Sequence, residues 1–85
     1  LNPRLEGDPA TLQRVLAALD AEATDDAGGI VGRHCVKSLC ISEGEAELTL
    51  TFPPSCGSGK RLAESAFATL RRLLPDTDVY VLHAT

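Results

Sequence analysis

The residue best placed for chemistry is Cys56, which stands in a proline- and glycine-rich stretch (53–59) directly before a predicted helix. Backbone N–H groups at a helix start favour an anion, so they lower the pKa of a thiol toward the reactive thiolate. Such a thiolate can ligate iron or attack an electrophile. Position alone leaves open that Cys56 is a small loop residue without a role.

The other cysteines, Cys35 and Cys40, are separated by four residues, with His34 beside the first. Cluster sites with this spacing need further cysteines close by. On a strand, positions that differ by an odd number point to opposite faces, which disfavours a shared metal. We therefore predict that both pack in the core. An odd count of three thiols also argues against a disulfide framework.

Two further clusters could bind ions. Residues 57–61 (Gly-Ser-Gly-Lys-Arg) lack the spacing of a phosphate-binding loop, because Pro54 stands where its first glycine belongs and Arg61 follows Lys60. We expect glycines that open a helix, with an anion site from Gly57 to Lys60 left open.

The acidic side chains at the end of the first predicted helix and in the loop after it can in principle hold a hard cation. This acidic cluster has no EF-hand spacing, so a solvated loop is the default interpretation. Neither a Ser-His-Asp nor a His-Glu-x-x-His arrangement occurs, and we predict no catalytic activity. The cluster consists of Asp20, Glu22, Asp25 and Asp26.

Composition limits the classes of function. Eighty-five residues predict a single domain over 1–85. A net charge of −4 disfavours nucleic-acid binding. No apolar run is long enough to cross a bilayer, and residues 1–9 do not read as a signal peptide. The odd number of cysteines suits a reducing compartment in which free thiols persist, so we predict a cytoplasmic protein. The sequence contains no methionine, so we expect that its first residue is not the natural start; a tag, a trimmed terminus or a domain cut from a longer protein would each explain this.

The first predicted element is a helix that follows residues 1–7, which we expect to be flexible. Asp8 is a good N-cap and Pro9 suits the first helical position. A polar, acidic loop over 24–29 ends the helix. The apolar stripe comprises Leu12, Val15, Leu16 and Leu19.

A hairpin and a second helix follow. Apolar and polar residues alternate through 45–52, and a strand over 36–41 precedes them. The step from Val36 to Leu39 breaks strict alternation, so we expect a bulge or a strand start there. Gly44 suits the turn between these strands. The second helix covers 58–74 and a last strand covers 79–83. The apolar face of the second helix comprises Leu62, Ala63, Ala66, Phe67, Leu70 and Leu73.

The predicted order is therefore α-β-β-α-β, a small α/β (α+β) domain. The second strand, second helix and third strand form a crossover unit, which places the outer strands parallel. We predict a three-stranded mixed sheet with both helices on one face.

Several stretches in this order resemble a known family. Residues 19–22 (Leu-Asp-Ala-Glu) resemble its Asp-Pro-Glu, and 30–41 resemble its I-V-x4-V-x2-V/L-x-I/V strand pattern. Residues 48–56 are similar to its L-T-L-T-x-P-x-C segment, and 79–81 to its last V-x-V strand. This domain is shared by PaaD- and SufT-like iron–sulfur maturation proteins, by cytosolic iron–sulfur assembly components and by the N-terminal part of Mrp/ApbC-type ATPases.

The resemblance implies an adaptor in iron–sulfur cluster assembly or delivery, with Cys56 at the family's cysteine position and a transient cluster as cargo. Asp20 and Glu22 match its acidic pair and would add metal ligands. Implied partners are assembly proteins, client apoproteins and a fused or separate P-loop ATPase, but neither nucleic acid nor membrane; a homodimer stays open. Departures are Ala21 for proline, a longer acidic loop, one extra residue before Cys56 and Gly57 after it.

Two other classes of function stay open. One is a small-molecule or metal-sensing module that uses the acidic loop or the anion site from Gly57 to Lys60, without cluster chemistry. Thermal shift with metal ions and phosphate separates it from the adaptor hypothesis. The other is an oligomerisation domain, which should expose an apolar face along a strand edge.

Overall fold

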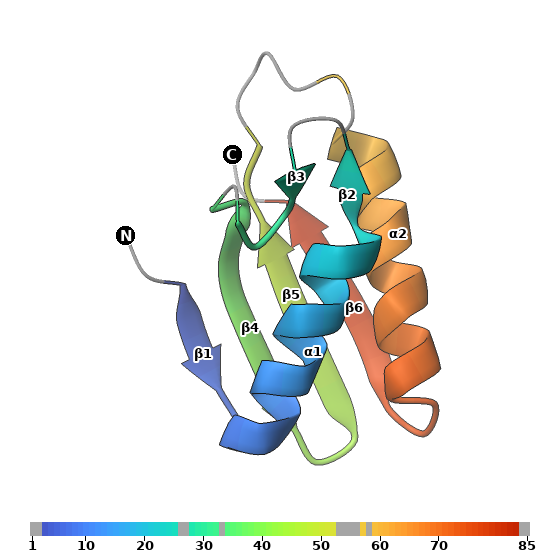
Figure 1. Cartoon of the computed structure of the whole chain (residues 1–85). Helices are drawn as coiled ribbons and strands as arrows, with labels where there is room; N and C mark the ends of the chain where they lie inside the picture. The colour runs from blue at the N-terminus through green and yellow to red at the C-terminus, as the bar shows by residue number, and fades with distance from the viewer. Residues whose placement is uncertain (1–2, 26–27, 33, 53–56, 58, 84–85) are drawn as a thin grey trace.

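A computed structural model describes residues 3–25, 28–32, 34–52, 57 and 59–83. Figure 1 shows the elements in chain order. They are β1 (Arg4–Glu6), α1 (Pro9–Glu22), β2 (Thr24–Asp25), β3 (Gly28–Gly29), β4 (Val36–Ser42), β5 (Glu45–Leu50), α2 (Gly59–Leu73) and β6 (Asp78–His83).

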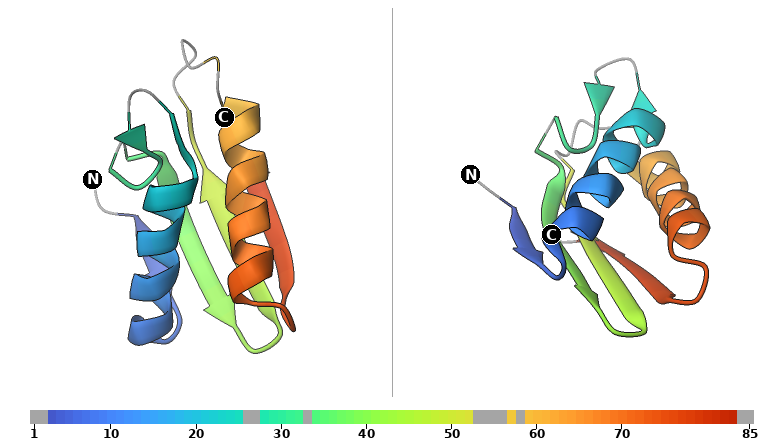
Figure 2. Two further views of the ribbon diagram at one scale, coloured as in Figure 1. Left: turned by 45° about the vertical axis from the view of Figure 1, so that its right-hand side comes forward. Right: turned by 60° about the horizontal axis from the view of Figure 1, so that its bottom comes forward.

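The main sheet has four strands in the order β1-β4-β5-β6, and β2 and β3 form a separate antiparallel pair. β4 and β5 make an antiparallel hairpin, whereas β1 runs parallel to β4 and β5 parallel to β6. Both helices lie on one face of the sheet (Figure 2). The predicted α/β class, the mixed sheet and the placement of the helices are confirmed, but the sheet has four strands rather than three.

The additional strand is β1, which falls within the segment expected to be flexible. Its three residues are all exposed, so no apolar pattern marks it in the sequence. Leu5 instead pairs with Leu39 along the edge of β4. Gly7, at φ 132°, then turns the chain into α1, and a Cβ atom there would stand 2.6 Å from the Ile41 carbonyl oxygen. Backbone pairing therefore fixes residues 4–6.

The hairpin has the predicted irregularities. The register between β4 and β5 shifts between Val36 and Ser38, which confirms the bulge. Gly44 takes a left-handed φ of 84° in the turn, where a side chain would strain the backbone. The period-two pattern of β5 buries Ala46 and Leu48 beneath the helices.

Both helices begin close to the predicted positions. The Asp8 carboxylate caps α1 by accepting a hydrogen bond from the Thr11 backbone N–H at 3.0 Å. The inward faces form one core with the sheet, in which Val15, Leu19 and Leu70 are fully buried. Phe67 is an exception to the predicted apolar face, because its side chain is 42% exposed. In the described part of the chain, neither helix is long and apolar enough to cross a membrane.

Candidate functional site

The loop that carries Cys56 joins β5 to α2, and residues 53–56 lie outside the described part of the chain. The described residues on either side fix where this loop begins and ends. The Thr51 backbone N–H donates to the Cys35 carbonyl oxygen at 2.8 Å, which holds the chain beside the start of β4. The prediction that Cys56 presents a thiol at the helix start stays untested.

Phe52 joins the two ends of the loop. A Cβ atom on Gly59, the first residue of α2, would stand 3.1 Å from Phe52 Cδ2, so the ring and the helix start are in close contact. The Phe52 ring centroid is also 5.8 Å from that of His83, at the end of β6. The carboxyl ends of parallel β5 and β6 therefore meet the amino end of α2 at one corner. Ligands of open α/β sheets characteristically bind at such strand ends.

Asp20, a predicted metal ligand, holds the end of α1 against the turn that follows β3. Its Oδ1 accepts a hydrogen bond from the Gly32 backbone N–H at 2.9 Å. Gly29 packs on the same residue so closely that a Cβ atom would stand 2.2 Å from the Asp20 carbonyl oxygen. The Asp20 carboxylate therefore stabilises the contact between the end of α1 and the turn after β3, and one of its two oxygens is used in that hydrogen bond.

Glu22, the second predicted acidic ligand, connects the two helices. Its Oε1 accepts from the Thr69 hydroxyl at 3.2 Å, and its Oε2 accepts from the Arg72 guanidinium. Thr69 lies ten residues after Gly59, which is about 15 Å along the helix axis. The Glu22 carboxylate therefore contacts the second half of α2 rather than the helix start that borders the Cys56 loop.

The structure therefore does not gather the predicted ligands into one described site. Within the described ranges, no group of three His, Cys, Asp or Glu side chains lies close enough to hold a metal ion. Asp26 lies outside these ranges, as does the Asp25 side chain. For the anion site, Gly57 and Lys60 are exposed and Ser58 lies outside the description. Cluster, metal and anion binding all remain predictions.

The remaining cysteines differ in burial. Cys35 precedes β4, and the bulge between Val36 and Ser38 separates it from Cys40, so strand alternation does not relate the two. Cys35 is 2% exposed and belongs to the core, as expected. Cys40 is half-buried on the face of β4 away from the helices, so its predicted core position is wrong. The reason is the strand alternation that turns its neighbour Leu39 inward.

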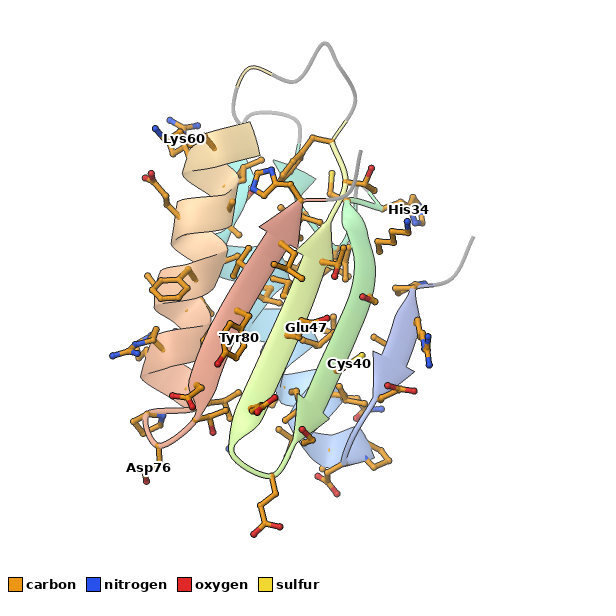
Figure 3. All side chains as sticks on the ribbon, turned by 180° about the vertical axis from the view of Figure 1, so that it is seen from behind. His34, Cys40, Glu47, Lys60, Asp76 and Tyr80 are labelled. Atoms are coloured by element: carbon orange, nitrogen blue, oxygen red, sulfur yellow. The ribbon has the colours of Figure 1, made fainter. Side chains whose placement is uncertain are left out.

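Cys40 belongs to a row of side chains that the register of four strands creates on the open face. It pairs with Glu6 on β1 and with Glu47 on β5, and Glu47 pairs with Tyr80 on β6. Figure 3 shows Cys40, Glu47 and Tyr80 on this face. The sequence does not predict that these side chains lie in one row, because no residue pattern in the sequence indicates that β1 is a strand paired with β4.

The environment of Cys40 keeps its thiol protonated. The hydrogen bond from the thiol to the Glu6 carboxylate raises the pKa of Cys40, and loss of hydration and the Glu6 charge raise it further. The same hydrogen bond lowers the pKa of Glu6, and Arg4 lowers it further through its ion pair at 2.9 Å. A protonated thiol is a poor nucleophile and metal ligand, so Cys40 is unsuited to the chemistry predicted for Cys56.

Comparisons with known proteins identify the fold. Neither protein-family models nor curated proteins match the sequence. Among solved structures, the chain is similar to the crystal structure of a domain of unknown function, DUF59, from Bacillus anthracis. The match covers 88% of this chain and 74% of that chain with a TM-score of 0.73 and 20% sequence identity. The chain therefore has the DUF59 fold.

Proposed function

We propose that this domain is an accessory or adaptor in iron–sulfur cluster assembly or delivery, without catalysis of its own. The observation that carries the proposal is the match to the DUF59 fold over most of the chain, since that fold family is associated with iron–sulfur assembly. The motif resemblance is independent support, because it places Cys56 in the loop between β5 and α2. The cluster is cargo, and the domain acts by contact with assembly proteins or clients.

The geometry of the corner supports a thiol role for this loop. Its described ends meet through Phe52 and Gly59 at the amino end of α2. Unpaired backbone N–H groups at a helix start stabilise a thiolate and the negative charge of a thiolate-bound cluster. In this proposal Asp20 and Glu22 position the end of α1, since their carboxylates are engaged in internal hydrogen bonds. The same engagement gives the metal-sensing alternative no support.

Anaerobic reconstitution with ferrous iron and sulfide, followed by visible absorption, tests the cluster role. We expect cluster absorption with the wild type and with Cys40→Ser, and loss of most of that absorption with Cys56→Ser. Cys40→Ser is the control because it removes a thiol that is only half-buried and whose raised pKa disfavours metal binding.

Equal absorption in all three proteins would contradict a role for Cys56. Absence of absorption in all three would contradict cluster binding. A client-maturation assay with Cys56→Ser distinguishes an adaptor that needs the thiol from one that acts through protein contacts alone. If the thiol is needed, the variant should lose client maturation while it keeps its fold and melting temperature.

A further inference from the structure

A groove of about 450 Å³ lies between α2 and β6, on the side of the molecule away from α1. The α2 wall presents one aromatic ring among charged residues, and β6 supplies the floor and the other wall. Its lining comprises Lys60, Ala63, Glu64, Phe67 and residues 79–83.

β6 is an edge strand, and its outer backbone groups pair with no described residue. The Asp78 backbone N–H donates to the Gly44 carbonyl oxygen, on the side of β5. Backbone groups alternate in direction along a strand, so those of Val79, Val81 and His83 point away from β5. The groove therefore contains a row of N–H donors and C=O acceptors that an added strand could pair with.

Apolar side chains border this edge on both faces. Phe67, on α2, is 42% exposed, and Tyr80 and Leu82 on the open face are each 47% exposed. An extended segment sends alternate side chains to opposite faces of a sheet. One strand at this edge would therefore cover Phe67 with one set of side chains and Tyr80 and Leu82 with the other, which a helix could not do.

The charges beside the groove indicate the character of the occupant. Lys60 lies at one end, and the Arg71 guanidinium stands 5.9 Å from the Phe67 ring centroid further along α2. Glu64 lies between them and is the one acid among the described lining residues. Lys60 is the one Lys or Arg among the described lining residues, and Arg71 stands outside the lining beside Phe67. A segment with an acidic residue at an end of its apolar stretch could pair with either cation.

A second copy of this chain fits the edge poorly. α2 lies along the outer side of β6 (Figures 1 and 3). Two β6 strands related by a two-fold axis would stand about 4.8 Å apart, whereas packed helices need about 8–10 Å between their axes. The two α2 helices would therefore compete for one space. A single extended segment from another protein avoids this conflict.

We propose that the α2–β6 groove binds an extended segment of a partner protein, which adds a strand to the β6 edge. Backbone hydrogen bonds to Val79, Val81 and His83 hold it, alternate apolar side chains pack on Phe67 and on the open face, and an acidic residue pairs with Lys60 or Arg71. This is the strand-addition mode of peptide recognition. The proposal uses no residue of 53–56, so its outcome is separate from that of the cluster experiment.

Amide hydrogen exchange by NMR tests the proposal. The probes are synthetic peptides of about seven residues in which apolar and polar residues alternate and aspartate stands near one end. Control peptides contain the same residues with the apolar ones grouped together. We expect the best alternating peptide to slow exchange about tenfold or more at Val79, Val81 and His83, and the grouped peptides to leave these rates unchanged.

Variants connect the effect to the groove. Val81→Pro removes an outward N–H without removing a hydrogen bond to β5, and Phe67→Ser removes the aromatic wall; both should abolish the slowing. Ala68→Ser, an exposed change on the same helix, should keep it. If Val81→Pro fails to fold, Phe67→Ser alone decides. The proposal is overturned if no alternating peptide slows these amides, or if slowing appears without peptide and grows with protein concentration.

Discussion

At the scale of single residues, the surroundings of Cys40 differ from those that the sequence predicts for Cys56. Cys40 donates to a carboxylate on a neighbouring strand, which favours the neutral thiol. Cys56 precedes a helix start, where general electrostatics favour the thiolate. A lone cysteine on an accessible sheet face would ordinarily be the first candidate for reactivity, and its neighbour Glu6 changes that expectation.

The Cys40 interpretation predicts a specific change in reactivity. In a Cys56→Ser background, Glu6→Gln should speed alkylation of Cys40 by iodoacetamide at pH 8, because loss of the carboxylate lowers the pKa of the thiol toward its ordinary value. Glu47→Gln is the matched control and should have a smaller effect, since Glu47 contributes least to raising that pKa. Mass spectrometry over time gives the rates. Equal rates for the two variants would disprove the assignment to Glu6.

At the scale of elements, α1 depends on connections at both ends. Asp8 caps its start, and Asp20 and Glu22 connect its last turns to the β3 turn and to α2. Hydrogen bonds from the Thr11 backbone N–H and hydroxyl lower the pKa of Asp8. Because the folded pKa is below the unfolded one, this stabilisation is complete above the unfolded pKa and is lost as pH falls through the folded pKa.

The cap therefore predicts a pH-dependent stability. Asp8→Asn keeps a capping oxygen but removes the titration, so its melting temperature should fall less steeply than that of the wild type as the pH drops below the ordinary pKa of an aspartate, because the pKa of Asp8 is lowered in the folded protein. Asp8→Ala should be less stable than both at pH 7. Circular dichroism melts at several pH values measure this. Parallel wild-type and Asp8→Asn curves would show that the carboxylate contributes no titrating stability.

At the scale of the whole molecule, two β-α-β crossovers stand on either side of a central hairpin and leave two sheet edges. β1 covers one side of β4, and β6 forms the other edge. Exposed edges invite pairing with other chains. The short, charged β1 ends the sheet at one edge, whereas β6 is longer and borders apolar side chains. The molecule is therefore asymmetric in where it can accept a further strand.

Removal of residues 1–6 tests the role of β1. The deletion keeps Gly7 and the Asp8 cap but exposes the edge of β4, so we expect a loss of roughly 1–3 kcal/mol in the free energy of unfolding, from a few lost strand hydrogen bonds. Aggregation should also increase with protein concentration. Urea unfolding and light scattering measure the two effects. An unchanged unfolding midpoint would mean that β1 does not contribute to the fold in solution.

The sequence by itself determined the elements whose residues follow a strong local pattern. Alternation predicted through 45–52 matched β5 over Glu45–Leu50, and the Asp8–Pro9 helix start and the irregularity at Val36 also matched the structure, because local sterics and one-sided burial fix them. Cys35 was likewise placed in the core correctly.

Only the tertiary structure decided which residues face one another across strands and helices. The sequence gives no periodic signal for a three-residue exposed strand such as β1, so the pairing of Glu6 with Cys40 was not foreseen. Phe67 fits the apolar face of α2 by spacing, yet the helix lies at the edge of the sheet and leaves the ring exposed beside β6. Asp20 and Glu22, which the resemblance offered as metal ligands, instead hold the end of α1, since their hydrogen-bond partners come from segments distant in sequence. Register and helix position are properties of the assembled sheet, and local sequence does not encode them.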